Sequence, residues 1–296
     1  MEIEKANEIG FCTGVRRAID IIEKAARELG AIQTLGPIVH NQQVVEKLAA
    51  SGVTVAESLD EVTGGNIAIS SHGVSPHILD EAKARGLNIV DTTCPFVRRA
   101  QVTVEKLVGE GLFVIVFGDA SHPEVQGVLG FAKGNGMATT EMPEFEKLPQ
   151  QVGLLSQTTQ SFSGFSNFVS SFIGTYLESL LEIRVINTIC NATRRHQKAA
   201  LELAHRVDLM LVVGSLKSAN TRRLAEICSA IVPTHHIETA RDIDKSWLRD
   251  KRKRHIGVTA GASTPDETID EVMAFDARKS RGIGGILELG NVVRIA

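Results

Sequence analysis

Three copies of one cysteine-led heptapeptide divide this chain of 296 residues. The copies are Cys12-Thr-Gly-Val-Arg-Arg-Ala18, Cys94-Pro-Phe-Val-Arg-Arg-Ala100 and Cys190-Asn-Ala-Thr-Arg-Arg-His196. In each copy a short extended segment precedes the cysteine and a helical pattern follows it. Spacings of 82 and 96 residues between the cysteines therefore predict three similar structural units, each with one cysteine at the start of a helix.

Apolar, β-branched runs alternate with amphipathic helical stretches along almost the whole chain. Strands are expected at 66–70, 112–117, 152–155, 209–213 and 255–258, each ending in small or polar residues. Helices are expected at 13–29, 41–50, 76–85, 96–110, 122–131, 161–179, 192–205, 218–229 and 265–279. Continuous apolar strands of this kind fit parallel sheets covered on both faces. The sequence therefore predicts an α/β fold, and ligands of such folds bind where the strands end.

Composition argues against nucleic acid and membrane partners. The 32 Lys and Arg are balanced by 35 Asp and Glu, and the aromatic residues are 11 Phe, one Trp and one Tyr, which leaves little for base stacking. No apolar run approaches the roughly 18–20 residues that cross a bilayer, and residues 1–5 have no signal-peptide pattern. We expect a cytoplasmic protein in which the basic run 250–255 is a solvated turn.

The cysteine positions suit metal binding. The partial positive charge and unpaired N–H groups of a helix N-terminus favour the thiolate, which is the metal-binding form. Three units around a common axis would bring Cys12, Cys94 and Cys190 together. Two alternatives stay open at this point, namely three structural cysteines or two disulfides. Cys228 lacks the repeat and lies on an apolar helix face, so we expect it in the core.

Three thiolates leave the identity of the metal open. A structural zinc site normally has four protein ligands, whereas three ligands leave one coordination position for substrate. A 4Fe–4S cluster normally takes four cysteines, so three would leave one iron open. The candidates from the residues alone are therefore a catalytic iron–sulfur cluster, a zinc hydrolase with three cysteine ligands, and a non-catalytic iron–sulfur carrier.

Polar residues recur at the predicted strand ends. His40, His72 and His122 each lie at a strand-to-helix turn beside Ser, Asn or Gly, and we expect each to open a helix. Protonated histidine together with helix N-termini suits a phosphate. Further hydroxyl and amide groups follow other strands; they are Thr158, Ser215, Ser218, Asn220 and Ser263, and such residues also serve as N-caps. Glu124 follows Pro123 in a first helical turn, where a carboxyl group can deliver a proton or complement the helix dipole.

The common nucleotide and hydrolase motifs are absent from the sequence. No Gly-x-Gly-x-x-Gly follows a predicted strand and no Gly-x-x-x-x-Gly-Lys-Ser/Thr occurs, so dinucleotide and P-loop sites are not supported. The segment around Ser263 is not a Gly-x-Ser-x-Gly elbow.

Nine motifs in order carry a family resemblance from about residue 9 to 270. They are Gly10-Phe-Cys12-x-Gly-Val, Gly36-Pro-Ile-Val-His40-Asn41, Ser71-His72-Gly73-Val, Asp91-Thr-Thr-Cys94-Pro, His122-Pro-Glu124-Val-x-Gly127, Ser156-Gln-Thr158-Thr159, Ile189-Cys190-x-Ala-Thr193, Val213-Gly-Ser215 and Val258-Thr-Ala-Gly-Ala-Ser263. In these motifs the chain closely resembles the LytB family of 4-hydroxy-3-methylbut-2-enyl diphosphate reductases, which end the methylerythritol phosphate route to isoprenoids.

The resemblance implies a fold of three pseudo-threefold-related α/β domains, a trefoil with parallel-rich sheets around a central cavity. The domains implied are 13–95, 96–189, and 1–12 together with 190–281, followed by a C-terminal tail at 282–296. The residues before Cys12 would return to the third domain. The sequence from Arg278 onward is Gly-rich, and we expect this tail to be irregular.

The resemblance also implies a site and a reaction. Cys12, Cys94 and Cys190 would bind one 4Fe–4S cluster with an open iron, and the substrate hydroxyl would bind that iron near Thr158 and Glu124. The residues implied to hold the diphosphate are His40, His72, His122, Ser218, Asn220 and Ser263. Two electrons from a ferredoxin or flavodoxin would enter one at a time, Glu124 would supply a proton, and water would leave. Protonation of the allylic product at either end would give isopentenyl and dimethylallyl diphosphate.

Two positions depart from the family pattern. The family commonly has Ser-Ser-Asn where this chain has Ser218-Ala219-Asn220, so one hydroxyl is lost beside the implied diphosphate site. The family usually has Arg-Gln where this chain has His196-Gln197. The many polar residues expected around the cysteines favour the reductase over a carrier, which needs no ring of phosphate-binding groups.

Overall fold

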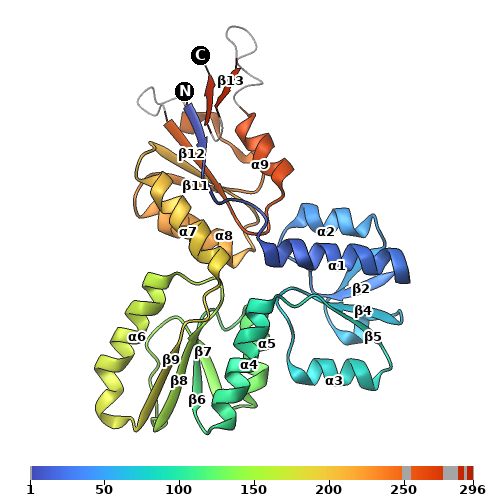
Figure 1. Ribbon diagram of the computed structural model, residues 1–296, viewed down its shortest axis with the longest axis vertical. Helices are drawn as coiled ribbons and strands as arrows, with labels where there is room; N and C mark the ends of the chain where they lie inside the picture. The colour runs from blue at the N-terminus through green and yellow to red at the C-terminus, as the bar shows by residue number, and fades with distance from the viewer. Residues whose placement is uncertain (1, 249–254, 276–285, 290–291, 296) are drawn as a thin grey trace. The chain divides into compact units, whose positions relative to one another are not determined.

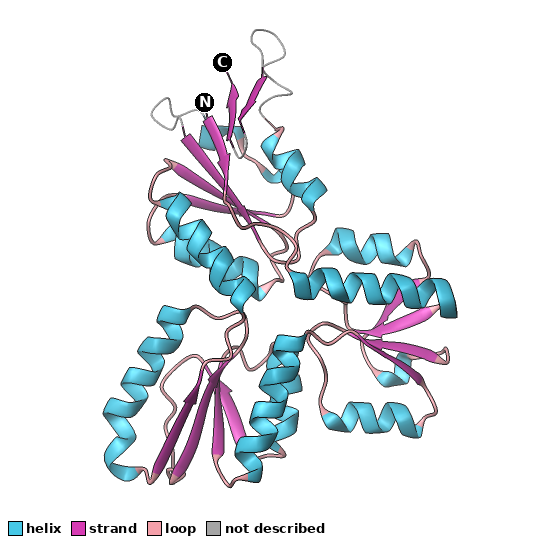
Figure 2. Ribbon diagram, in the orientation of Figure 1, coloured by secondary structure: helices cyan, strands magenta, loops and turns pink. Residues whose placement is uncertain are grey.

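The computed structural model describes residues 2–248, 255–275, 286–289 and 292–295. By its internal contacts the chain divides into two units, which are described one at a time. Unit 1 comprises Met1–Thr13, His40–Gln42 and Asn191–Ala296, and unit 2 comprises Gly14–Val39 and Gln43–Cys190. Figure 2 shows strands flanked by helices in both units.

The first sheet of unit 2 has the strand order β3-β2-β4-β5, and all its strands are parallel. They are β2 (Ile32–Leu35), β3 (Val53–Ala56), β4 (Asn66–Ile69) and β5 (Asn88–Asp91). Figure 1 shows α1 (Thr13–Leu29) and α2 (Gln42–Ala49) on one side of this sheet and α3 (Pro76–Ala84) on the other. Ile67 and Ile69 alternate with Ala68 along β4 and pack in one cluster with α3, as period-two burial requires.

The second sheet of unit 2 has the order β7-β6-β8-β9 and is also parallel throughout. Its strands are β6 (Phe113–Phe117), β7 (Gly136–Thr139), β8 (Gln151–Ser156) and β9 (Glu182–Ile186). The helices α4 (Pro95–Gly109) and α5 (Pro123–Leu129) share a core cluster with Val114 and Val116 of β6. Ile115 and Phe117 point to the other face, where they pack on α6 (Phe162–Tyr176).

Unit 1 contains a six-stranded sheet of order β11-β10-β12-β1-β14-β13. Four of its strands run parallel; they are β1 (Glu2–Lys5), β10 (Leu209–Val213), β11 (Thr234–Ile237) and β12 (His255–Ala260). The other two, β13 (Ile286–Leu289) and β14 (Val292–Ile295), are antiparallel. Met210 and Val212 pack with α7 (Asn191–Ala204) and α8 (Ala219–Ser229), and Leu211 packs with α9 (Asp266–Met273).

One topology occurs three times. In each sheet the four parallel strands can be numbered in chain order, with β1 counted as the fourth strand after β10, β11 and β12. The order of the strands across the sheet is then second, first, third, fourth in all three sheets. The fourth strands are β5, β9 and β1, and each leads directly toward Cys94, Cys190 or Cys12. The pairing of β1 with β12 explains how the first residues of the chain complete a sheet whose other strands lie beyond residue 208.

The predicted alternation of strands and helices is confirmed, and the helices begin and end close to the expected residues. The helix expected at 161–179 ends at Tyr176 and continues as a 3₁₀ turn at Leu177–Ser179. Gly30 and Gly111, which follow α1 and α4, have φ values of 78° and 90°, the left-handed conformation that ends helices. The three-domain boundaries stay a prediction.

The expectation of an irregular C-terminal tail is wrong for the residues described. β14 pairs with β1 in antiparallel register, and β13 pairs with β14. The physical reason is that β1 would otherwise present the unpaired N–H and C=O groups of an edge strand. The basic run 250–255 falls almost entirely outside the described residues, as do positions 276–279 of the last predicted helix.

Within the described part of the chain, the helices are all too short or too polar to cross a lipid bilayer.

Candidate functional site

Each cysteine of the repeat occupies the same position in its sheet. Cys94 is the N-cap of α4, and Cys12 and Cys190 directly precede α1 and α7. The backbone N–H of each cysteine donates to a backbone carbonyl oxygen: Cys12 to Ala262 (3.2 Å), Cys94 to Ser71 (3.0 Å) and Cys190 to Thr158 (3.0 Å). All three carbonyls lie in the loop after the third strand of the sheet. The predicted repeat is thus a repeated hydrogen bond as well as a repeated sequence.

The cysteines of the repeat differ from Cys228 in their surroundings. All four are thiols rather than halves of a disulfide, which overturns the alternative of two bridges. Cys12, Cys94 and Cys190 are half-buried, whereas Cys228 is fully buried among Leu224 and other apolar side chains of unit 1. Burial raises the pKa of the Cys228 thiol to about 12. Cys228 is therefore a core residue, as predicted.

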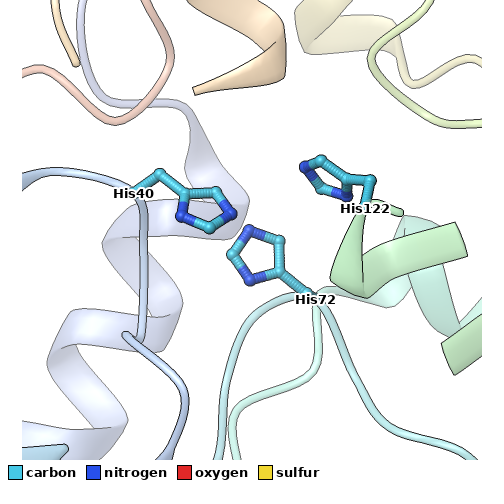
Figure 3. Close-up of side chains that lie close together, drawn as sticks. All are labelled: His40, His72 and His122. Atoms are coloured by element: carbon cyan, nitrogen blue, oxygen red, sulfur yellow. The ribbon is translucent and has the colours of Figure 1, made fainter. Parts of the chain in front are cut away.

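The loops after β4 and β6 bring His72 and His122 together in unit 2. Their rings meet edge to face with centroids 5.5 Å apart, and their ring nitrogens lie within 4.8 Å (Figure 3). His122 is the N-cap of α5, and its Nδ1 accepts from the backbone N–H of Glu124 at 3.1 Å. A neutral His122 therefore carries its proton on Nε2, which makes that nitrogen a hydrogen-bond donor.

The expectation that each histidine opens a helix holds directly only for His122. His72 lies in the turn after β4, and the N-cap of α3 is Ser75, three residues further on. The reason is that the turn makes its own contacts: the backbone N–H of Gly73 donates to the Ser70 carbonyl at 3.0 Å, and His72 Nδ1 lies 3.3 Å from Ser70 Oγ.

Glu124 is buried and is held by Thr158. Only 3% of Glu124 is exposed. Its Oε1 accepts from the backbone N–H of Thr158 at 2.7 Å, and its Oε2 accepts from Thr158 Oγ1 at 2.8 Å. Burial raises the pKa of Glu124 and outweighs these two hydrogen bonds, which lower it. A carboxyl group in this position is more than a surface charge at a helix end, because the environment favours its protonated form.

In unit 1, His40 and Ser263 lie next to each other. Ser263 follows β12, and its Oγ donates to the His40 carbonyl at 3.3 Å. Burial lowers the pKa of His40, and the positive charges of Arg222 and Lys217 lower it further. His40 is therefore neutral in the ligand-free protein, although the sequence suggested a protonated ring.

The start of α8 carries the other predicted polar residues of unit 1. Ser218 is its N-cap and accepts from the Thr221 N–H at 3.3 Å, so the capping interpretation of this serine is confirmed. Asn220 is 5% exposed, and neither Oδ1 nor Nδ2 of its buried amide has a hydrogen-bond partner among the described residues. Leaving a buried polar group unsatisfied costs about 1–3 kcal/mol, so this amide is a candidate ligand-binding group.

The two departures from the family pattern lie on helices of unit 1. Ala219 is the first residue of α8, so its backbone N–H belongs to the end of the helix that attracts anions. His196 is 3% exposed on α7, and burial lowers its pKa. His196 is therefore a neutral buried ring in place of a charged side chain.

Several residues that support the site in unit 2 were not identified from the sequence. Ser71 donates to the Ile38 carbonyl from both its N–H (3.2 Å) and its Oγ (2.8 Å), and its own carbonyl accepts from Cys94. Arg17 of the first repeat donates from Nη1 to the Thr93 carbonyl at 3.2 Å, directly before Cys94. The paired arginines were a visible signal, since they recur in all three copies of the repeat.

Comparison with known proteins places the chain in one family. A model of the LytB protein family matches residues 3–275. A 4-hydroxy-3-methylbut-2-enyl diphosphate reductase from Dehalococcoides mccartyi strain CBDB1 is 50% identical over 285 residues, which cover 95% of this chain and 100% of that protein. A protein of the same name from Geobacter sulfurreducens is 46% identical, with 94% and 99% of the two chains covered.

Solved structures show the same fold. The Plasmodium falciparum E-1-hydroxy-2-methyl-but-2-enyl-4-diphosphate reductase superimposes with a TM-score of 0.84 and 29% identity, covering 92% of this chain and 86% of that one. A structure of (E)-4-hydroxy-3-methyl-but-2-enyl diphosphate reductase, described as the terminal enzyme of the non-mevalonate pathway, gives a TM-score of 0.66 at 36% identity and covers 94% of this chain and 100% of that one. The chain belongs to the LytB protein family.

Proposed function

We propose that the chain reduces (E)-4-hydroxy-3-methylbut-2-enyl diphosphate to isopentenyl and dimethylallyl diphosphate. The observation that carries the proposal is the buried Glu124, held by Thr158, whose carbonyl in turn accepts from the N–H of Cys190. Thr158 thereby contacts both the proposed proton donor, Glu124, and a candidate metal ligand, Cys190. The names of the relatives supply the substrate, and this arrangement supplies groups that fit it.

Cys12, Cys94 and Cys190 would hold a 4Fe–4S cluster. The donor set fits this group, because three half-buried thiols each follow the fourth strand of a sheet and precede a helix, where the helix N-terminus favours thiolates. Three cysteines leave one iron without a protein ligand. When bound, the cluster would supply single electrons and a Lewis-acidic iron beside the substrate hydroxyl.

His40, His72, His122, Ser218, Asn220 and Ser263 would bind the diphosphate. The support is the unsatisfied amide of Asn220 in unit 1 and the Nε2 of His122 in unit 2, which is the donor nitrogen of the neutral ring. The N-terminus of α8 adds N–H groups that attract anions.

Glu124 would deliver the proton that lets the substrate hydroxyl leave as water. Loss of hydroxide from carbon is unfavourable, so the departing oxygen needs a proton. With a proton on Oε2, Glu124 donates to Thr158 Oγ1 instead of accepting from it. The Thr158 hydroxyl can then pass its own proton to the substrate oxygen and take one from Glu124. The reduction consumes two protons, and the second, taken up from solvent, adds to carbon at either end of the allylic system.

The electrons would come from a ferredoxin or flavodoxin, and the enzyme would work in the cytoplasm. Single-electron donors of this kind suit a reaction that consumes two electrons in separate steps.

Metal analysis of anaerobically purified protein separates this proposal from its alternatives. The reductase requires about four iron and four acid-labile sulfide per chain. About one zinc without sulfide would instead indicate the hydrolase with three cysteine ligands. Iron and sulfide in a protein that leaves the hydroxylated diphosphate unchanged with a reduced dye would indicate a carrier.

A further inference from the structure

The turn that carries His72 rests on a buried glutamine of the helix that starts at Cys94. Gln101 is fully buried, although its neighbours on the same face of α4 are apolar: Val97, Ala100 and Val104. A polar side chain at such a position costs free energy unless its groups are hydrogen-bonded. The hydrogen-bond partners of Gln101 therefore indicate its structural role.

Both ends of the Gln101 amide have partners. Its Nε2 donates to the Val74 carbonyl at 3.3 Å, and its Oε1 accepts from Arg98 Nη1 at 2.8 Å. A guanidinium group only donates, so Arg98 fixes the orientation of the amide and leaves Nε2 to face the turn. The bond to Val74 lies two residues from His72.

Arg98 is itself held by the loop that leads to Cys94. Its Nη2 forms an ion pair with Asp91 Oδ2 and lies 3.5 Å from Thr93 Oγ1. Asp91 also accepts from the Thr93 N–H at 2.9 Å. The orientation of Gln101 is therefore tied to the segment between β5 and Cys94.

The backbone of the turn lies directly on Gln101. Gly73 has φ of 69°, and a Cβ added there would lie 2.6 Å from Gln101 Nε2 and 3.1 Å from Thr93 Cγ2. On another side of the turn, a Cβ added to Gly127 of α5 would lie 3.3 Å from the Gly73 carbonyl oxygen. The turn is thus packed between α4, whose N-cap is Cys94, and α5, which carries Glu124.

We infer that Gln101 is a positioning residue for His72. Its hydrogen bond to Val74 fixes the end of the turn after His72, while the Cys94 N–H fixes the end before it through the Ser71 carbonyl. This inference rests on the proposed role of His72 in binding the diphosphate. Gln101 itself does not touch substrate in this account, because it lies beneath the turn and is fully buried.

Two variants remove the donor without removing the bulk. Gln101→Glu keeps the shape of the side chain and the acceptor for Arg98, but it places an oxygen against the Val74 carbonyl. Gln101→Met keeps about the same volume without either hydrogen bond. Gln126→Met, at an exposed position on α5, is the matched control. Each is purified anaerobically, and its iron content, KM, kcat and affinity for inorganic pyrophosphate by calorimetry are measured.

We expect both Gln101 variants to hold as much iron as the unmodified protein, to bind pyrophosphate about tenfold more weakly, and to raise KM by a similar factor while kcat changes by less than about twofold. Normal KM and pyrophosphate affinity in Gln101→Met would show that only the volume of residue 101 matters and would overturn the inference, because methionine has no hydrogen-bond donor.

His72→Asn is measured in parallel. If His72→Asn binds pyrophosphate weakly and Gln101→Met binds it normally, the inference about Gln101 fails alone. If His72→Asn binds it normally, the proposed role of His72 fails as well.

Discussion

Thr158 donates two hydrogen bonds to the carboxyl group of Glu124, one from its backbone N–H at 2.7 Å and one from Oγ1 at 2.8 Å. The same residue accepts from the N–H of Cys190 through its carbonyl. Thr158 therefore fixes both oxygens of a buried acid and the main chain at a candidate metal ligand. The proposed chemistry depends on this connection, because proton and electrons must reach the same substrate.

Glu124→Gln is expected to keep the metal centre and lose most turnover. The amide retains an oxygen for the Thr158 N–H and a donor for Thr158 Oγ1, so the local fold is preserved, but it has no acidic proton to give. We expect kcat to fall by roughly 10²–10⁴-fold, the usual worth of a general acid, with iron content unchanged. Glu105→Gln, on the exposed face of α4, is the control. Near-normal turnover of Glu124→Gln would remove Glu124 as the proton donor.

The same variant changes how stability depends on pH. Burial raises the pKa of Glu124 above its ordinary value of 4.5, so the folded protein holds the proton more tightly than the unfolded chain does. The stabilisation from the protonated carboxyl group is complete below pH 4.5 and is lost as pH rises through the raised value. We therefore expect the melting temperature of the unmodified protein to fall relative to that of Glu124→Gln as pH rises from 4.5 through the raised pKa. A constant difference across this range would contradict the raised pKa.

Serine substitutions separate the cysteines of the repeat from the fourth cysteine. Cys12→Ser, Cys94→Ser and Cys190→Ser are each expected to lose the iron and its visible absorbance. Cys228→Ser should keep both, while its free energy of unfolding falls by about 1–3 kcal/mol because a hydroxyl group replaces a thiol in an apolar core. Full iron content in any one variant of the repeat would refute the assignment of that cysteine.

Binding of pyrophosphate is expected to draw a proton onto His40. Burial, Arg222 and Lys217 keep the ring neutral without ligand by lowering its pKa below the ordinary 6.5. A bound anion raises that pKa again, so protons are taken up on binding near pH 6.5. Calorimetry in buffers of different ionisation enthalpy measures the number of protons taken up. The same measurement on His40→Asn gives the protons exchanged by pyrophosphate itself, which are subtracted. Equal proton uptake by the two proteins would show that His40 stays neutral in the complex.

The sequence predicted what depends on local pattern. Apolar strands that end in small residues and the spacing of the cysteines were enough for the α/β class and for the place of each cysteine before a helix. The position of Glu124 in the first turn of α5 was also readable, since Pro123 marks that turn.

Other features depend on partners far away in the chain. The strands β13 and β14 exist because β1, almost 290 residues earlier, offers an edge to pair with. In the sequence, Gln101 is a polar residue on an otherwise apolar face of α4. Only the folded structure shows that it contacts the turn at Gly73 and Val74. The neutral state of His40 likewise depends on burial and on Arg222 and Lys217, which no local pattern reveals.

Turnover of (E)-4-hydroxy-3-methylbut-2-enyl diphosphate by the anaerobic protein is the direct test of the proposed reductase function. The protein is supplied with a reduced one-electron dye, and the dye oxidised and the products formed are both measured. The proposed function predicts that about two dye equivalents are oxidised per substrate, with isopentenyl and dimethylallyl diphosphate as products and no release of inorganic phosphate or pyrophosphate. Release of phosphate or pyrophosphate without dye oxidation, or a fully loaded protein that leaves the substrate unchanged, would contradict it.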